Sequence, residues 1–104
     1  MKRIVTVKIP LGAAPALVLA DALYNIQKIA RKCSGIMCSA IAANLTVQLN
    51  GVTIVDAMAT QIANAYPWPM PMDVQLAPDS AFTVGFNDPT GLSADEYVTL
   101  VFDE

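Results

Sequence analysis

The chain has 104 residues, which is enough for one domain and too few for two, so residues 1–104 are expected to form a single domain. Hydrophobic residues make up 55% of the chain and charged residues 14%, which excludes intrinsic disorder, because disorder needs low hydrophobicity and high charge. The net charge is −3 at pH 7, and histidine, the commonest general base and metal ligand, is absent. This composition is typical of a protein that packs against partners.

The charges are divided unevenly along the chain. Six bases and one acid, Asp21, give the first 32 residues a net charge of +5, and eight acids without a base give the other 72 residues −8. Two explanations stay open: the charges mix on the surface of one fold, or a basic edge of one subunit meets an acidic edge of another. The acidity of the whole chain and the lack of a recognised motif disfavour nucleic acid as a partner.

The N-terminal segment loosely resembles a signal peptide, because Lys2 and Arg3 precede apolar residues. Lys8 and Pro10 interrupt the apolar run, so we expect this segment to belong to the mature fold. The longest apolar run, residues 13–20, is far shorter than the ~20 residues of a membrane-spanning helix. No membrane partner is therefore expected.

The two cysteines, Cys33 and Cys38, form a C-x4-C pair without the further ligands that zinc needs. A disulfide between them requires the chain to turn back at Ser34-Gly35. Two free, buried thiols that act as small apolar residues are the preferred interpretation.

Local patterns predict a strand first and then an ambiguous segment. Lys2–Ile9 alternates and is rich in β-branched residues, which predicts a strand. For residues 14–33, periodicity favours an amphipathic helix, with Pro15 in its first turn and Gly35 beyond its end. The same stretch also fits strands at 17–23 and 24–33, provided that a bulge keeps one face buried.

A β-hairpin is the clearest local signal. Residues 45–49 and 52–55 alternate between apolar and polar, and Asn50-Gly51 between them suits a two-residue type I′ turn. Residues 56–65 are expected to be a short connector with one or two helical turns.

The proline-rich segment 67–72 is expected to be extended, with Trp68, Met70 and Met72 projecting from it. Three prolines at every second position cannot join a central ladder. Two interpretations stay open: a contact patch, since Trp and Met are enriched at interfaces, or a crossover that covers one end of the core. In either case Trp68 is predicted to be largely buried.

The last third of the sequence is β-rich. Strands are predicted at 73–76, 81–86 and 97–102, with a turn at 78–80. The regular spacing of strands and turns predicts a mainly β fold, a single antiparallel β-sandwich with one short helix at most. The alternative is an α+β fold with the amphipathic helix at about 14–33 packed on a sheet.

Motifs for catalysis are missing from the sequence. It contains no phosphate loop, dinucleotide fingerprint or nucleophile elbow. Neighbouring carboxylates such as Asp95 and Glu96 face opposite ways on a strand, so they do not suit an acid/base pair. We therefore expect no enzyme, and assign no catalytic, metal or cofactor site.

From Ile26 onward the chain resembles a pattern that recurs in small structural proteins of tailed and icosahedral bacteriophages. The residues that carry the resemblance are Ile26-Gln27-Lys28-Ile29, Gly35, the hairpin 45–55, the proline-rich segment 67–71, Pro78-Asp79-Ser80, and the strands 82–87 and 97–102. The resemblance implies a single jelly-roll-like sandwich that oligomerises within a virion. The implied partners are copies of itself and other virion proteins, and the implied location is the virion, after synthesis in the host cytoplasm.

The leading functional hypothesis is therefore a non-enzymatic virion structural protein: a capsid vertex, decoration or connector-type subunit that self-assembles through apolar strand surfaces. The candidate interface residues are Trp68, Met70, Met72, Lys28, Arg31 and Lys32. The alternative is a β-sandwich binding module for carbohydrate or a host receptor, for which Tyr66 and Trp68 would supply aromatic contacts.

Overall fold

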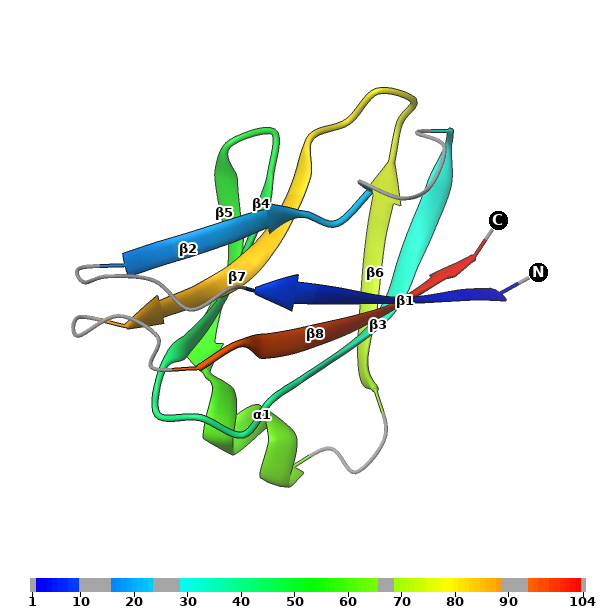
Figure 1. The fold of residues 1–104 in the computed structure, drawn as a ribbon. Helices are drawn as coiled ribbons and strands as arrows, with labels where there is room; N and C mark the ends of the chain where they lie inside the picture. The colour runs from blue at the N-terminus through cyan, green and yellow to red at the C-terminus, as the bar shows by residue number, and fades with distance from the viewer. Residues whose placement is uncertain (1, 10–15, 24–28, 66–68, 89–93, 104) are drawn as a thin grey trace.

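The computed structural model describes residues 2–9, 16–23, 29–65, 69–88 and 94–103, and these contain eight strands and one helix (Figure 1). The elements are β1 (Lys2–Ile9), β2 (Ala16–Asp21), β3 (Arg31–Cys38), β4 (Asn44–Leu49), β5 (Val52–Met58), α1 (Ala59–Ala65), β6 (Met70–Leu76), β7 (Phe82–Asp88) and β8 (Glu96–Asp103).

The strands form two four-stranded sheets, in the orders β1-β8-β3-β6 and β2-β7-β4-β5, and all neighbours are antiparallel. Only the β4–β5 hairpin stays within one sheet, and every other pair of consecutive strands crosses from one sheet to the other. Eight strands in two such sheets make a jelly roll. The predicted β-sandwich is confirmed.

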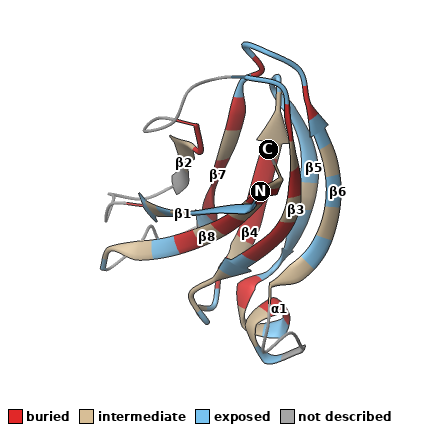
Figure 2. Cartoon of the chain, turned by 90° about the vertical axis from the view of Figure 1, so that its right-hand side faces the viewer, coloured by how far each residue is buried: buried red, intermediate tan, exposed pale blue. Residues whose placement is uncertain are grey.

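Alternation along the strands places the core between the two sheets (Figure 2). Phe82, Val84 and Phe86 of β7 are fully buried, as are Val98, Leu100 and Phe102 of β8. The rings of Phe82 and Phe102 meet edge to face, 6.3 Å apart and at 73°. Because these rings come from different sheets, their contact is a direct link between the two layers.

The alternative fold with a helix at about 14–33 is wrong, because β2 and the start of β3 occupy described parts of that range. Ala20 lies opposite Val84 of β7 and packs against the core, an arrangement that a helix could not provide. Pairing with β7 outweighs the local helical periodicity. The strand limits also differ from those considered for the β alternative, because β2 ends at Asp21 and β3 continues past Gly35, with a shift of register between Cys33 and Gly35.

The predicted hairpin turn is confirmed. Asn50 and Gly51 both have positive φ, 51° and 83°, as a type I′ turn requires. The backbone N–H of Asn50 donates to the carbonyl oxygen of Ala81 at 2.7 Å. The backbone N–H of Ala81 donates to the side-chain oxygen Oδ1 of Asn50 at 2.9 Å. The turn is thereby attached to the chain just before β7.

After the hairpin turn the strand is longer than the sequence indicates, and the expected short helix of about two turns follows it. β5 continues to Met58, and α1 begins at Ala59. The Ala59 N–H donates to the carbonyl oxygen of Ala43 at 2.8 Å, and the Thr60 hydroxyl donates to that of Ile41 at 2.7 Å. Ala59 and Ile62 are buried, so α1 covers one end of the core.

The proline-rich segment enters the fold as the edge strand β6, in agreement with the exclusion of its prolines from a central position. Pro71 lies opposite Gly35 of β3. A Cβ atom at Gly35 would lie 2.9 Å from Cβ of Pro69 and 3.6 Å from Cβ of Val101. Glycine is therefore needed at position 35 for β3 and the proline-rich segment to approach this closely.

Gly35→Ala is expected to lower the free energy of unfolding by about 1–3 kcal/mol, because the rigid Pro69 ring must move to make room for the new methyl group. Urea denaturation measures the change. Gly51→Asn is the control: nothing lies within 4 Å of a Cβ there, and asparagine tolerates the positive φ. Equal losses for the two variants would show that the contact with Pro69 has no steric role.

Candidate assembly surface

The predicted interface residues are distributed between the core, the surface and the undescribed part of the chain. Lys28 and Trp68 lie outside the described residues, so the predicted burial of Trp68 stays a prediction. Met70 and Met72 are half-buried on the core-facing side of β6 and pack against the core of their own chain. This arrangement is typical of a segment that covers the core.

Arg31 opens β3 with its side chain directed inward, and only 6% of the residue is exposed. Its guanidinium carbon lies 5.8 Å from the centre of the Phe102 ring, within the range of a cation–π interaction. Reversing the charge of Arg31 would therefore affect folding as well as any assembly.

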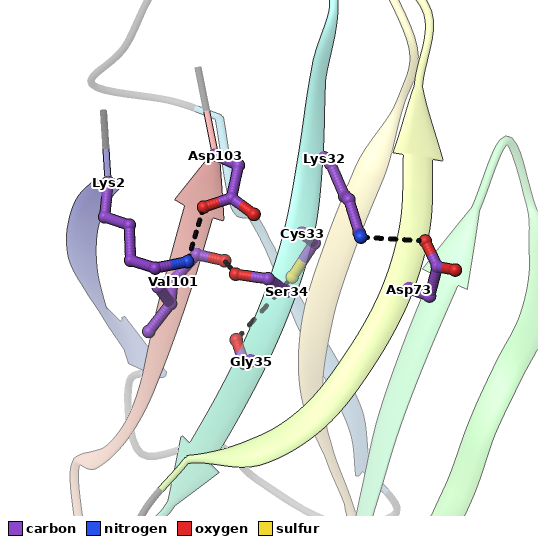
Figure 3. A network of polar contacts seen from close by, with 8 residues as sticks. All are labelled: Lys2, Lys32, Cys33, Ser34, Gly35, Asp73, Val101 and Asp103. Atoms are coloured by element: carbon purple, nitrogen blue, oxygen red, sulfur yellow. Dashed lines mark hydrogen bonds and ion pairs between the residues drawn. The ribbon is translucent and has the colours of Figure 1, made fainter.

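Lys32 points outward and takes part in a row of charges across the outer face of the sheet (Figure 3). Lys32 Nζ lies 3.4 Å from Asp73 Oδ1, and Lys2 Nζ lies 2.6 Å from Asp103 Oδ1. Lys2 and Lys32 both face Asp103 in the strand register. The hydrogen bond from Lys2, reinforced by the charge of Lys32, holds the pKa of Asp103 below its ordinary value.

A further ion pair joins Lys8 Nζ to Asp95 Oδ2 at 3.1 Å, and this contact raises the pKa of Lys8. In each of the three ion pairs the base comes from the first third of the chain and the acid from the rest. Much of the uneven charge along the sequence is thus combined on the surface of one subunit.

Exposed apolar side chains gather on β5, a surface that the sequence analysis did not single out. Val52 is 64% exposed, and Ile54 and Met58 are each about two-fifths exposed. β5 is an edge strand, because only β4 pairs with it. The sequence shows the hairpin but does not tell which of its two strands lies at the edge. Elsewhere in the described chain, the large exposed apolar residues are Ile4, Ile29, Met37 and Tyr97.

Both cysteines are free, as expected. Cys33 is buried and Cys38 half-buried, and both belong to one extended strand. Five residues of strand span roughly 17 Å, which is too far for a disulfide. The Cys33 thiol approaches the carbonyl oxygen of Gly35 at 3.6 Å, and the Cys38 thiol that of Ala59 at 3.8 Å. Burial raises the pKa of each thiol to about 11.

The raised pKa values predict that stability falls as the pH rises from 9 to 11. Thiols of the unfolded chain ionise near their ordinary pKa of 9.0, whereas those of the folded chain keep their protons until about pH 11. Between these values the unfolded state binds fewer protons, so the free energy of unfolding decreases with pH. Urea denaturation at several pH values measures this slope. A Cys33→Ala/Cys38→Ala variant should have a shallower slope, and an equal slope would assign the loss to other groups.

A hollow of about 390 Å³ opens between β1 and β2, the first strands of the two sheets. Its lining includes Val5 and Val7 from β1 and Ala20 and Ala22 from the β2 side, with Lys8 and Asp21 as charged members. Among the described residues, no group of three or more Cys, Asp or Glu side chains is placed to hold a metal ion.

Comparisons with protein-family models, curated proteins and solved structures find no match for this chain. Within the part of the chain that the structure describes, no helix combines the length and apolar character needed to cross a bilayer.

Proposed function

We propose that this protein is a non-enzymatic structural subunit of a virion, where it assembles with copies of itself and with other virion proteins. The observation that carries the proposal is a jelly roll whose edge strand β5 exposes three large apolar side chains. Viral capsid domains are among the proteins that use this fold, so the argument is one of analogy at the level of the fold.

Exposed apolar side chains on an edge support the self-assembly part of the proposal. A soluble monomer gains nothing from apolar residues exposed on one strand, and such patches mark contact surfaces. Permanent interfaces between subunits resemble a domain core that has been divided, with apolar residues on both sides. Val52, Ile54 and Met58 supply such residues at an edge where hydrogen-bonding groups of the backbone are also unpaired.

The test measures the mass of the purified chain by size-exclusion chromatography with light scattering over a range of concentrations. A stable ring, shell or lattice of many copies supports a structural subunit, and a monomer at every concentration overturns self-assembly. Mass spectrometry of purified virus particles tests the proposed location. Detection at many copies per particle is the expected result, and absence from the particles contradicts a structural role in the virion.

A second candidate is a binding module for carbohydrate, favoured by polar side chains of β4 and β5, which belong to one sheet. Asn44 Nδ2 donates to Asp56 Oδ1 at 3.0 Å, and Gln48 Nε2 donates to Thr53 Oγ1 at 3.2 Å. Amide and carboxylate groups of this kind can exchange hydrogen bonds with sugar hydroxyls. A monomer that binds an immobilised glycan, and loses that binding in Asn44→Ala and Gln48→Ala variants, would select this candidate.

A further inference from the structure

The edge strands on the two sides of the sandwich differ in their charged residues, although Lys2, Lys8 and Asp73 also form ion pairs within the chain. β1 and β2 are the edge strands on one side, and they contain three bases, Lys2, Arg3 and Lys8, against the single acid Asp21. β5 and β6 are the opposite edges of the same sheets, and they contain the acids Asp56 and Asp73 and no base. Figure 2 shows β1 and β2 on one side of the molecule and β5 and β6 on the other.

The edges also differ in how well they resist pairing with another chain. β1 has its three bases, and β6 has Pro71 and an irregular register with β3, all of which are common protections of edge strands. β5 has a register irregularity opposite Val47 and Gln48, but it has no proline and no base. Its exposed side chains are mainly apolar, and Asp56 is its single charge.

The basic side offers a complementary shape. The hollow between β1 and β2 has a volume of about 390 Å³, which exceeds that of any one apolar side chain. Four of its lining residues are Val or Ala, so the hollow suits apolar side chains such as those of β5. Lys8 of β1 lines the hollow. It pairs with Asp95, but its side chain stays 58% exposed, so it can also attract the acid of an incoming β5 strand.

We infer that the β5 edge of one copy docks against the β1/β2 side of the next copy, with its apolar side chains in the hollow and Asp56 facing the bases of β1. This inference rests on the proposed self-assembly. The contact joins two different surfaces, so repetition of it produces a ring or a filament rather than a closed pair. Pairing of β1 with β1 would bring like charges together, and pairing of β5 with β5 would leave the hollow empty.

Cysteine crosslinking tests the geometry. Val7→Cys places a thiol on the core-facing side of β1, where Val7 lines the hollow, and Ile54→Cys places one on β5, where the native residue is 41% exposed. The native thiols, with pKa values of about 11, stay protonated and slow to react at pH 7. A short bismaleimide should join the two variants when they are mixed. One variant carries a tag that increases its mass, so the mixed product is distinguished from either variant joined to itself. The double variant should give a ladder of covalent oligomers.

Control crosslinking and light scattering separate the outcomes. Ala77→Cys, an exposed position in the loop after β6, should not crosslink to either variant. Crosslinking of Ile54→Cys to itself would overturn the inference in favour of a twofold contact between β5 strands. Assembly seen by light scattering without crosslinking of the mixed pair would also overturn it, while leaving the proposed function standing. A chain that stays monomeric at all concentrations would overturn both this inference and the proposed self-assembly.

A matched pair of acid substitutions tests the charge. Asp56→Asn keeps the shape of the side chain, and we expect it to slow association about two- to five-fold at low salt, with a smaller effect at high salt. Asp79→Asn removes another exposed acid, from the turn before β7, and should leave the rate unchanged. Stopped-flow light scattering measures both rates. Equal rates for the two variants would contradict a role of Asp56 in the contact.

Discussion

Replacing Phe102 by alanine is expected to lower the free energy of unfolding by about 3–5 kcal/mol, which is a large part of the 5–15 kcal/mol typical of a domain. Phe102 is fully buried, its ring contacts Phe82 of the opposite sheet, and the guanidinium of Arg31 lies over it. The substitution therefore leaves a cavity between the sheets and removes both ring contacts. Denaturant unfolding monitored by circular dichroism measures the loss.

Tyr97→Ala is the control on the same strand, because Tyr97 lies on the outer face of β8 and is 48% exposed. It should cost less than about 1 kcal/mol, in line with other surface substitutions. If Phe102→Ala lowered the free energy of unfolding no more than Tyr97→Ala, this would contradict the packing of the Phe102 ring between the two sheets. Phe82→Leu combined with Phe102→Leu in a double-mutant cycle isolates the contribution of the ring pair.

Arg31→Glu is expected to be the most damaging charge substitution in the described chain, with a loss of about 3–5 kcal/mol in the free energy of unfolding. The residue is 6% exposed, so the new carboxylate would lose its water and face the electron-rich surface of the Phe102 ring. Arg31→Met, which removes the charge but keeps a long apolar side chain, should cost less. Thermal and urea unfolding of the three proteins provide the comparison.

The neighbouring residue supplies the control for this prediction. Lys32→Glu makes the same change of charge on the outer face of β3, where it breaks the exposed ion pair with Asp73 and places a like charge beside Asp103. The side chain of Asp73 is 77% exposed, so the pair contributes no more than about 1 kcal/mol. Similar losses at positions 31 and 32 would contradict the inward direction of Arg31.

Strands that carry their own signal could be predicted from the sequence. Every second side chain is buried in the core along 82–86 of β7 and 98–102 of β8, and the Asn50-Gly51 turn sets the register at the start of the β4–β5 hairpin. In these elements, local propensity and tertiary packing favour the same conformation, so one sequence pattern is sufficient to identify each.

The segment 14–33 shows where sequence reasoning fails. Asp21, Asn25, Lys28 and Lys32 have the spacing of a polar helical stripe, but Asp21 ends one strand and Lys32 lies near the start of another. β2 is required because without it β7 would become an unprotected edge of its sheet. That requirement comes from a strand more than 60 positions further along, so a local window does not contain it.

The candidate surface was harder to predict than the fold, because exposure depends on sheet order. The sequence drew attention to Met70, Met72 and Arg31, residue types that are enriched at interfaces, and the structure packs all three against the core of their own chain. Val52 and Ile54 look like ordinary strand residues in the sequence. They become exposed only because β5 is the last strand of its sheet.

The pairing of β1 with β8 has a consequence for how the chain folds during translation. Lys2 lies opposite Asp103, and Ile9 lies opposite Glu96, so every pair in this ladder joins the two ends of the chain. β1 has no other partner among the described strands, so it stays unpaired until β8 has left the ribosome. Contacts of such high sequence separation make folding slow, on the order of milliseconds to seconds. Until then, the nascent chain therefore presents an unpaired strand that combines four apolar residues with three bases, and chaperones can act on it before any copy of the protein can assemble.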